Sequence, residues 1–89
     1  MEQKYFANIV LNKEKLSNGK IVFVVHCTNL GIASQGCTTE EAIENIKEAI
    51  ELYLEEEPEK YGELSLSNEP PIFSFIEVKK NAKITNFIR

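Results

Sequence analysis

The chain has 89 residues, of which 43% are hydrophobic and 27% charged, and its formal net charge at pH 7 is −4. This length corresponds to one domain, and the composition is that of a globular protein rather than a disordered one. No apolar run approaches the roughly 20 residues that a membrane helix needs, and the polar N-terminus lacks the apolar region of a secretory signal. We therefore expect a cytoplasmic protein that makes no contact with a membrane.

The first half of the chain carries three β-strand patterns. Residues 4–11 are rich in aromatic and β-branched side chains, and Ile21–Cys27 is an almost unbroken apolar run, as expected of a strand buried on both faces. The polar stretch between them contains Asn18-Gly19, a strong hairpin signal because both residues tolerate a positive φ. A short third strand is predicted over Ile32–Gly36.

The clearest signal is an amphipathic helix that begins after Thr38 and stops before Pro58. Thr38 and Glu41 have the spacing of a capping box, in which the hydroxyl and the carboxylate each accept a hydrogen bond from a free backbone N–H. Apolar side chains recur every three or four residues and form one stripe, made of Ala42, Ile43, Ile46, Ala49, Ile50 and Tyr53. This stripe predicts a helix that packs on one face of a sheet.

After a polar connection, residues 72–78 (IFSFIEV) predict a fourth strand, and residues 84–88 allow a short fifth strand or an ordered arm. The element order is then β-β-β-α-β, an α+β fold with an antiparallel meander and one crossover helix on one sheet face. The strand after the helix can lie parallel to a neighbour, with a right-handed crossover as the default. Because so short a chain buries a small core, we also expect a homodimer or a higher homo-oligomer.

Residue types that carry out chemistry are scarce. His26 is the only histidine, and its place after four apolar strand residues favours a structural role over acid–base catalysis. Cys27 and Cys37 lack the paired spacing of a zinc site and are expected to be free thiols, buried or half-buried. Cys37 precedes the helix start, where a thiolate is stabilised, but no general base lies near it in sequence.

The sequence also lacks a phosphate-binding loop and aspartate, and both absences argue against an enzyme. Gly31 and Gly36 are better explained by turns that need a positive φ than by a phosphate-binding loop, which requires more glycine and a lysine. All fourteen acidic residues are glutamate, whereas Mg²⁺-dependent nucleases usually hold the ion with aspartate. We therefore expect no enzyme: no catalytic residues, no metal and no cofactor.

The charge is unevenly distributed. Residues 21–77 contain twelve glutamates and two lysines, whereas residues 78–89 contain four basic residues and no acidic one. The acidic middle opposes binding to nucleic acid and suits a basic partner, although a solvated helix face is the simpler structural interpretation. The candidate contact residues are Glu44, Glu48 and Glu51 on the outward side of the helix. A strand edge that pairs with a partner sheet is the other candidate.

Several motifs occur together within residues 23–55. A His-Cys pair at residues 26–27 and a Leu-Gly pair at residues 30–31 precede SQGCTTEEA at residues 34–42 and NIKEAIELYLE at residues 45–55. In combination these motifs resemble the core of the HicB-like antitoxin family, and the similarity extends more weakly to the N-terminal hairpin and to residues 72–78. The sequence departs from the family at Thr28 and Gly31, where proline is common, and at Cys37, where aspartate is usual.

The resemblance implies a truncated RNase H-like sheet, assembly into dimers or larger oligomers, and a partner. That partner would be a small, basic, HicA-like ribonuclease toxin, which the domain would neutralise by covering its surface. Many family members carry a second, DNA-binding module. Because this chain ends at Arg89, we expect a single domain over residues 1–89, without that module and without direct nucleic-acid binding.

Two alternatives remain open. The protein can be an orphan homo-oligomeric binding module that has kept the fold and lost its toxin, because both functions require only a folded acidic surface. An RNase H-like nuclease is suggested by fold analogy alone, and the absence of aspartate opposes it.

Overall fold

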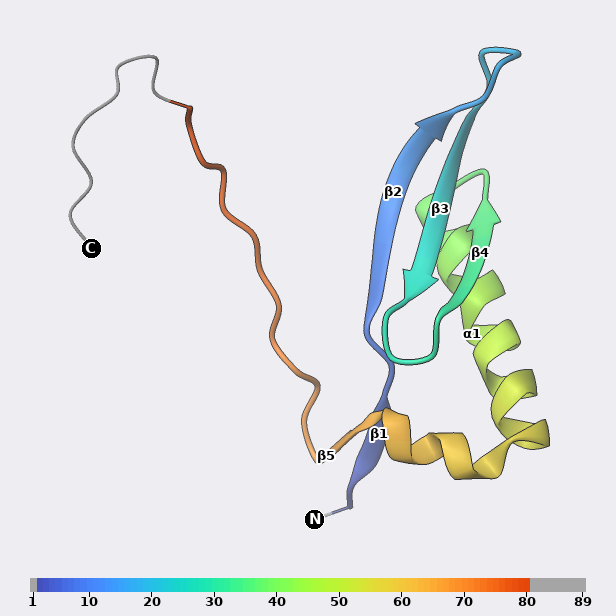
Figure 1. Ribbon diagram of the computed structural model, residues 1–89, viewed down its shortest axis with the longest axis vertical. Coiled ribbons are helices and arrows are strands. Elements are labelled where there is room, and N and C mark those ends of the chain that lie inside the picture. The colour runs from blue at the N-terminus through green and yellow to red at the C-terminus, as the bar shows by residue number, and fades with distance from the viewer. Residues whose placement is uncertain (1, 81–89) are drawn as a thin grey trace.

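The computed structural model of the chain describes residues 2–80 (Figure 1). It contains two small β-sheets, one long α-helix and one short 3₁₀-helix. In chain order the elements are β1 (Lys4–Phe6), β2 (Ile9–Lys15), β3 (Ile21–Cys27), β4 (Ile32–Gly36), α1 (Thr39–Glu56), η1 (Pro58–Glu63) and β5 (Ser65–Ser67). No helix within residues 2–80 is both long enough and apolar enough to cross a membrane.

Strands β2, β3 and β4 form an antiparallel sheet with β3 in the centre. β2 and β3 pair along all seven residues of each strand. Their hairpin turns at Gly19, which has a φ of 86°, and the Asn18 side chain accepts a hydrogen bond from the Lys20 N–H. The predicted meander is confirmed, but only Gly19, and not Asn18, has a positive φ.

Helix α1 begins as predicted, with Thr38 as its N-cap. The Thr38 hydroxyl accepts a 3.0 Å hydrogen bond from the Glu41 N–H. In return the Glu41 carboxylate accepts a 2.6 Å hydrogen bond from the N–H of Cys37, one residue earlier than in a capping box. The helix ends at Glu56, and Pro58, whose ring prevents the α-helix from continuing, begins η1.

The hydrophobic core lies between α1 and one face of the three-stranded sheet. Val25 and Cys27 of β3 are buried there, because alternate residues of a strand point to the same face. From α1 the buried side chains recur at four-residue intervals: Ala42, Ile46, Ile50 and Leu54. The predicted stripe is therefore largely confirmed, with two differences: Leu54 belongs to it, and Ile43 is 41% exposed.

The helix lies closest to β4, and a glycine permits this approach. A Cβ atom at Gly36 would lie 2.5 Å from the backbone nitrogen of Ala42, so any larger residue would push the helix away. Gly36 does not have a positive φ, whereas Gly31 has a φ of 70°. The prediction that both glycines serve turns is thus correct for Gly31 and wrong for Gly36, which serves close packing.

Strands β1 and β5 form a separate antiparallel pair beside η1, below the meander in Figure 1. The rings of Tyr5 and Tyr61 pack together with their centroids 4.8 Å apart. The Asn29 side chain links this unit to the meander: its Oδ1 accepts a 2.6 Å hydrogen bond from the Asn8 N–H, and its Nδ2 donates a 3.0 Å hydrogen bond to the Glu63 carbonyl.

The prediction of one strand over residues 4–11 is wrong, because the chain breaks between β1 and β2. At the break the Asn8 N–H donates to the Asn29 side chain, and the Asn8 carbonyl accepts from the Thr28 N–H. A side chain from a distant turn thus replaces a strand as the hydrogen-bond partner, which the local sequence pattern cannot reveal.

The fourth strand predicted over residues 72–78 is also absent from the described structure, in which these residues belong to no strand. The strand that follows the helix is instead β5, within the segment predicted as a polar connection, and it pairs antiparallel with β1. An apolar, β-branched run shows that a segment can form a strand but not which edge it will meet. Residues 84–88, the predicted fifth strand or arm, lie outside the described residues. The α+β class and the helix on one sheet face are confirmed.

Candidate protein-binding surfaces

Helix α1 has an acidic side that faces away from the sheet. Because successive helical residues are rotated by about 100°, Glu44, Glu48 and Glu51 fall opposite the buried Ile46. All three carboxylates are exposed, as predicted. The helix sequence, TEEAIENIKEAIELYLEE, contains seven glutamates and one lysine, so its outer surface is strongly negative.

This acidic side carries an energetic cost. Glu44 and Glu48, and likewise Glu51 and Glu55, are like charges four residues apart, and each such pair destabilises a helix by about 0.2–0.5 kcal/mol. The last helical turn contains no basic residue that would complement the negative end of the helix dipole. The core packing does not require these charges. A basic partner bound to this side of α1 would reduce the repulsion between the glutamates.

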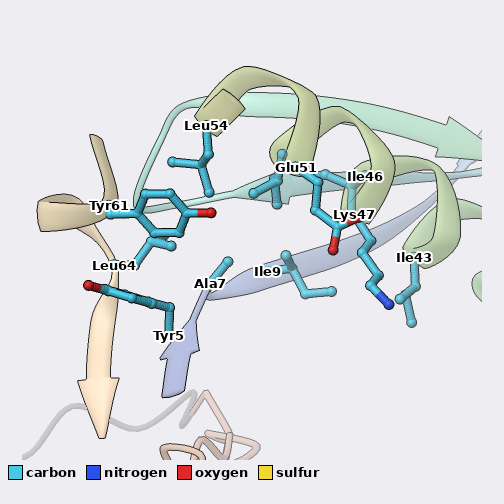
Figure 2. A pocket seen from close by; sticks show the side chains of 11 residues that line it. Tyr5, Ala7, Ile9, Ile43, Ile46, Lys47, Glu51, Leu54, Tyr61 and Leu64 are labelled. Carbon is cyan, nitrogen blue, oxygen red and sulfur yellow. The ribbon is translucent and has the colours of Figure 1, made fainter. Parts of the chain in front are cut away.

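An apolar groove of about 300 Å³ lies between α1, η1 and the segment from β1 to β2 (Figure 2). Tyr5 and Tyr61 lie at one end of the groove and Ile43 and Lys47 at the other. Ile9, Ile46, Ile50, Leu54 and Leu64 are among the residues that line it. Of the three predicted contact residues only Glu51 lines the groove, so the acidic side of α1 and the groove meet at this residue.

The groove exists because α1 covers the sheet unevenly. The helix packs mainly against β4 and β3, and β2 lies at the other edge of the sheet. In the described part of the chain β2 pairs only with β3, so the backbone groups of its outer edge have no strand partner. An open edge of this kind is a template for another strand.

After β5 the chain continues as an extended arm, residues 68–80, which runs away from the meander (Figure 1). The arm contains the apolar segment 72–78, and its side chains are exposed. A second groove, of about 590 Å³, separates Phe73 and Phe75 of the arm from residues 8–11 at the start of β2. Phe73 and Phe75 therefore lie across this space from the start of β2, and the arm does not pair with the open edge of that strand.

The residues considered for chemistry are not brought together. His26 is exposed on the sheet face opposite α1, where its strand neighbours are Val10 and Ala33. Both thiols are free, as predicted: Cys27 is buried, whereas Cys37 is exposed, contrary to the prediction of at least partial burial. Within residues 2–80 no group of three or more His, Cys, Asp or Glu side chains is arranged to hold a metal ion.

The sequence interpretation named a strand edge as a candidate contact without identifying the strand, and it did not include the groove. One signal pointed to the groove: Ile43 widens the apolar stripe of α1 beyond what a helix on a three-stranded sheet buries. In the structure Ile43 is 41% exposed and lines the groove. Ile43 thus adds apolar surface to the groove that α1 forms with the segment from β1 to β2.

Comparisons of the chain with protein-family models, with curated proteins and with solved structures each returned no match.

Proposed function

We propose that this protein is a non-enzymatic antitoxin that binds a small, basic, HicA-like ribonuclease toxin and covers its RNA-binding and catalytic surface. The observation that carries the proposal is the exposed row formed by Glu44, Glu48 and Glu51 on the outer side of α1. The resemblance of residues 23–55 to the HicB-like family also supports it, because the resemblance extends to motifs outside the acidic row, such as His26-Cys27 and SQG at residues 34–36.

The mechanism is steric and electrostatic. A ribonuclease that holds RNA presents lysine and arginine side chains to the phosphates, and a row of carboxylates can occupy the same positive groups. Glu44 and Glu48 are about 6 Å apart along the helix axis, so neighbouring basic side chains can meet successive carboxylates. The negative field of α1 also accelerates encounter with a basic partner, at rates that fall as salt rises. No covalent bond is made or broken.

The test is affinity capture from the native cell at moderate salt, followed by mass spectrometry, with the wild-type protein and the triple variant E44Q/E48Q/E51Q. We expect the wild type to retain a stoichiometric small basic protein. The triple variant should bind it roughly 3- to 150-fold more weakly, because each of the three exposed ion pairs contributes about 0.2–1 kcal/mol.

A matched variant, E57Q/E59Q/E63Q, removes the same charge from exposed positions after the helix and should keep the partner. If both triple variants lose the partner equally, binding depends on net charge and not on the outer face of α1. If the wild type retains no basic protein, the antitoxin proposal fails.

The second candidate function is an orphan homo-oligomeric binding module without a toxin. The exposed apolar arm favours it, because such a segment suits self-association whether or not a toxin exists. Recovery of the bait alone, in a defined oligomer, would favour this function over the first.

A further inference from the structure

The arm exposes an unusual amount of apolar surface. Segment 72–78 places five large hydrophobic side chains within seven residues, and each is at least 70% exposed: Ile72, Phe73, Phe75, Ile76 and Val78. The Cα radius of gyration is 17.8 Å, whereas a compact chain of this length has a value of about 12 Å. Exposed contiguous apolar surface of this kind marks an interaction site.

The segment has the composition of a β-strand. It is built from β-branched and aromatic residues, contains neither glycine nor proline, and is already extended. In a strand, alternate side chains point to opposite faces. One face of the segment would then present Phe73 and Phe75, and the other Ile72, Ile76 and Val78, so that both faces are apolar.

The open edge of β2 matches this segment in length and in surroundings. β2 has seven residues, as has the segment. On the α1 side of this edge lies the apolar groove that Ile9 and Ile43 line, and on the other side Val10 is 50% exposed. A strand added at this edge would fill the groove with one set of its side chains and cover Val10 with the other.

The arm does not occupy the edge of its own sheet. Phe73 and Phe75 face residues 8–11 across a space of about 590 Å³, and Figure 1 shows the arm diverging from β2 as both run away from β5. Pro70 and Pro71 precede the segment, and their fixed φ angles stiffen the connection in an extended form. The arm is thus held out where the sheet of another molecule can reach it.

We infer that two copies of this chain exchange arms, each adding residues 72–78 as a strand to the open edge of β2 in the other copy. The exchange is reciprocal and closes around a twofold axis, which leaves neither arm unpaired. It extends each meander to four strands and buries five large apolar side chains from each copy. The inference rests on the arm and the β2 edge, and not on the presence of a toxin.

The first test is the molar mass of the purified full chain, measured by light scattering after size exclusion. We expect a mass of two chains of 10.1 kDa each for the wild type. The variant F75D/I76D places a charge on each face of the segment and should have the mass of one chain. Its helical circular dichroism should be unchanged, because the arm contributes nothing to the core. The control L52D changes an exposed apolar residue of α1 and should remain a dimer.

The second test separates exchange from other modes of association. An isotope-filtered NOE spectrum of a 1:1 mixture of ¹³C-labelled and unlabelled chains reports only contacts between copies. We expect such contacts between the Phe75 ring and β2 methyl groups, including Val10. A monomeric wild type, a dimer that survives F75D/I76D, or arm contacts found only within one copy would each overturn the inference.

Neither test requires a partner protein. Failure of arm exchange therefore leaves the antitoxin proposal standing, and failure to find a toxin leaves arm exchange standing.

Discussion

Gly36 of β4 lies so close to Ala42 of α1 that a Cβ atom added to the glycine would be 2.5 Å from the alanine nitrogen. The same Cβ atom would be 2.9 Å from the carbonyl carbon of Glu41. Backbone atoms of a helix cannot move aside as a flexible side chain can. This contact holds the helix over β4 and leaves the β2 side of the sheet open.

The substitution Gly36→Ala should therefore lower the free energy of unfolding by about 1–3 kcal/mol, the usual cost of overpacking a core. Urea denaturation followed by circular dichroism measures this change. The control is Gly62→Ala, because a Cβ atom there meets nothing within 4 Å. The account of the helix–sheet contact is contradicted if the two variants have the same stability.

Removal of the helix cap should be the next most costly local change. In Thr38→Ala the Glu41 N–H loses its 3.0 Å hydrogen bond to the hydroxyl, and the loss should destabilise the protein by about 0.5–2 kcal/mol. The neighbouring substitution Thr39→Ala removes only an exposed contact with the Glu40 carboxylate and should cost less. The urea concentration at the midpoint of unfolding should therefore be lower for Thr38→Ala than for Thr39→Ala. Equal midpoints would show that Thr38 is not the cap.

Asn29 should contribute more to the stability of the protein than its place in a turn suggests. Its side chain joins the Asn8 N–H to the Glu63 carbonyl, and Asn29→Ala leaves the part-buried Asn8 N–H without a partner, whereas water can reach the exposed Glu63 carbonyl. We expect a loss of about 1–3 kcal/mol in the free energy of unfolding, with the fastest amide exchange in β1 and β5. Asn12→Ala, on the exposed surface of β2, is the comparison and should be nearly neutral. If amide exchange in β1 and β5 is equally slow in Asn29→Ala and Asn12→Ala, this role of Asn29 is contradicted.

The two thiols should differ sharply in accessibility. Cys37 is exposed beside the helix start, whereas Cys27 is 1% exposed in the core. A thiol reagent applied to the native protein should label one cysteine rapidly and the second only on unfolding. Cys37→Ser should abolish the rapid phase, and Cys27→Ser should leave it intact. Rapid labelling of both thiols in the wild type would contradict the burial of Cys27.

Local signals in the sequence predicted most of the fold. The hairpin signal at Gly19, the apolar run of β3 and the Thr38 cap depend on residues within a few positions of one another, and the structure confirms the hairpin, the strand and the cap. The expected burial of β3 on both faces is wrong, because His26 is exposed on the face opposite α1. The four-residue repeat of buried α1 side chains confirms the sheet-facing side of the helix, and with it the outward position of Glu44 and Glu48.

The differences arise where the structure depends on distant partners. The break at Asn8 involves the side chain of Asn29, and β5 pairs with β1, a strand about sixty residues away in the sequence. The composition of segment 72–78 favours a β-strand. Composition does not predict which strand edge the segment will pair with, or whether that edge belongs to the same molecule. The groove was missed for the same reason, since it depends on how Gly36 positions the helix relative to β2.

Neutralisation of a toxin is measured by the growth of cells that express the captured basic partner, alone and together with this protein. We expect that the partner alone arrests growth, that the wild type restores it, and that E44Q/E48Q/E51Q at equal expression fails to do so. If growth stays arrested in the presence of the wild type, or if the triple variant protects as fully as the wild type, the acidic face of α1 does not neutralise a toxin.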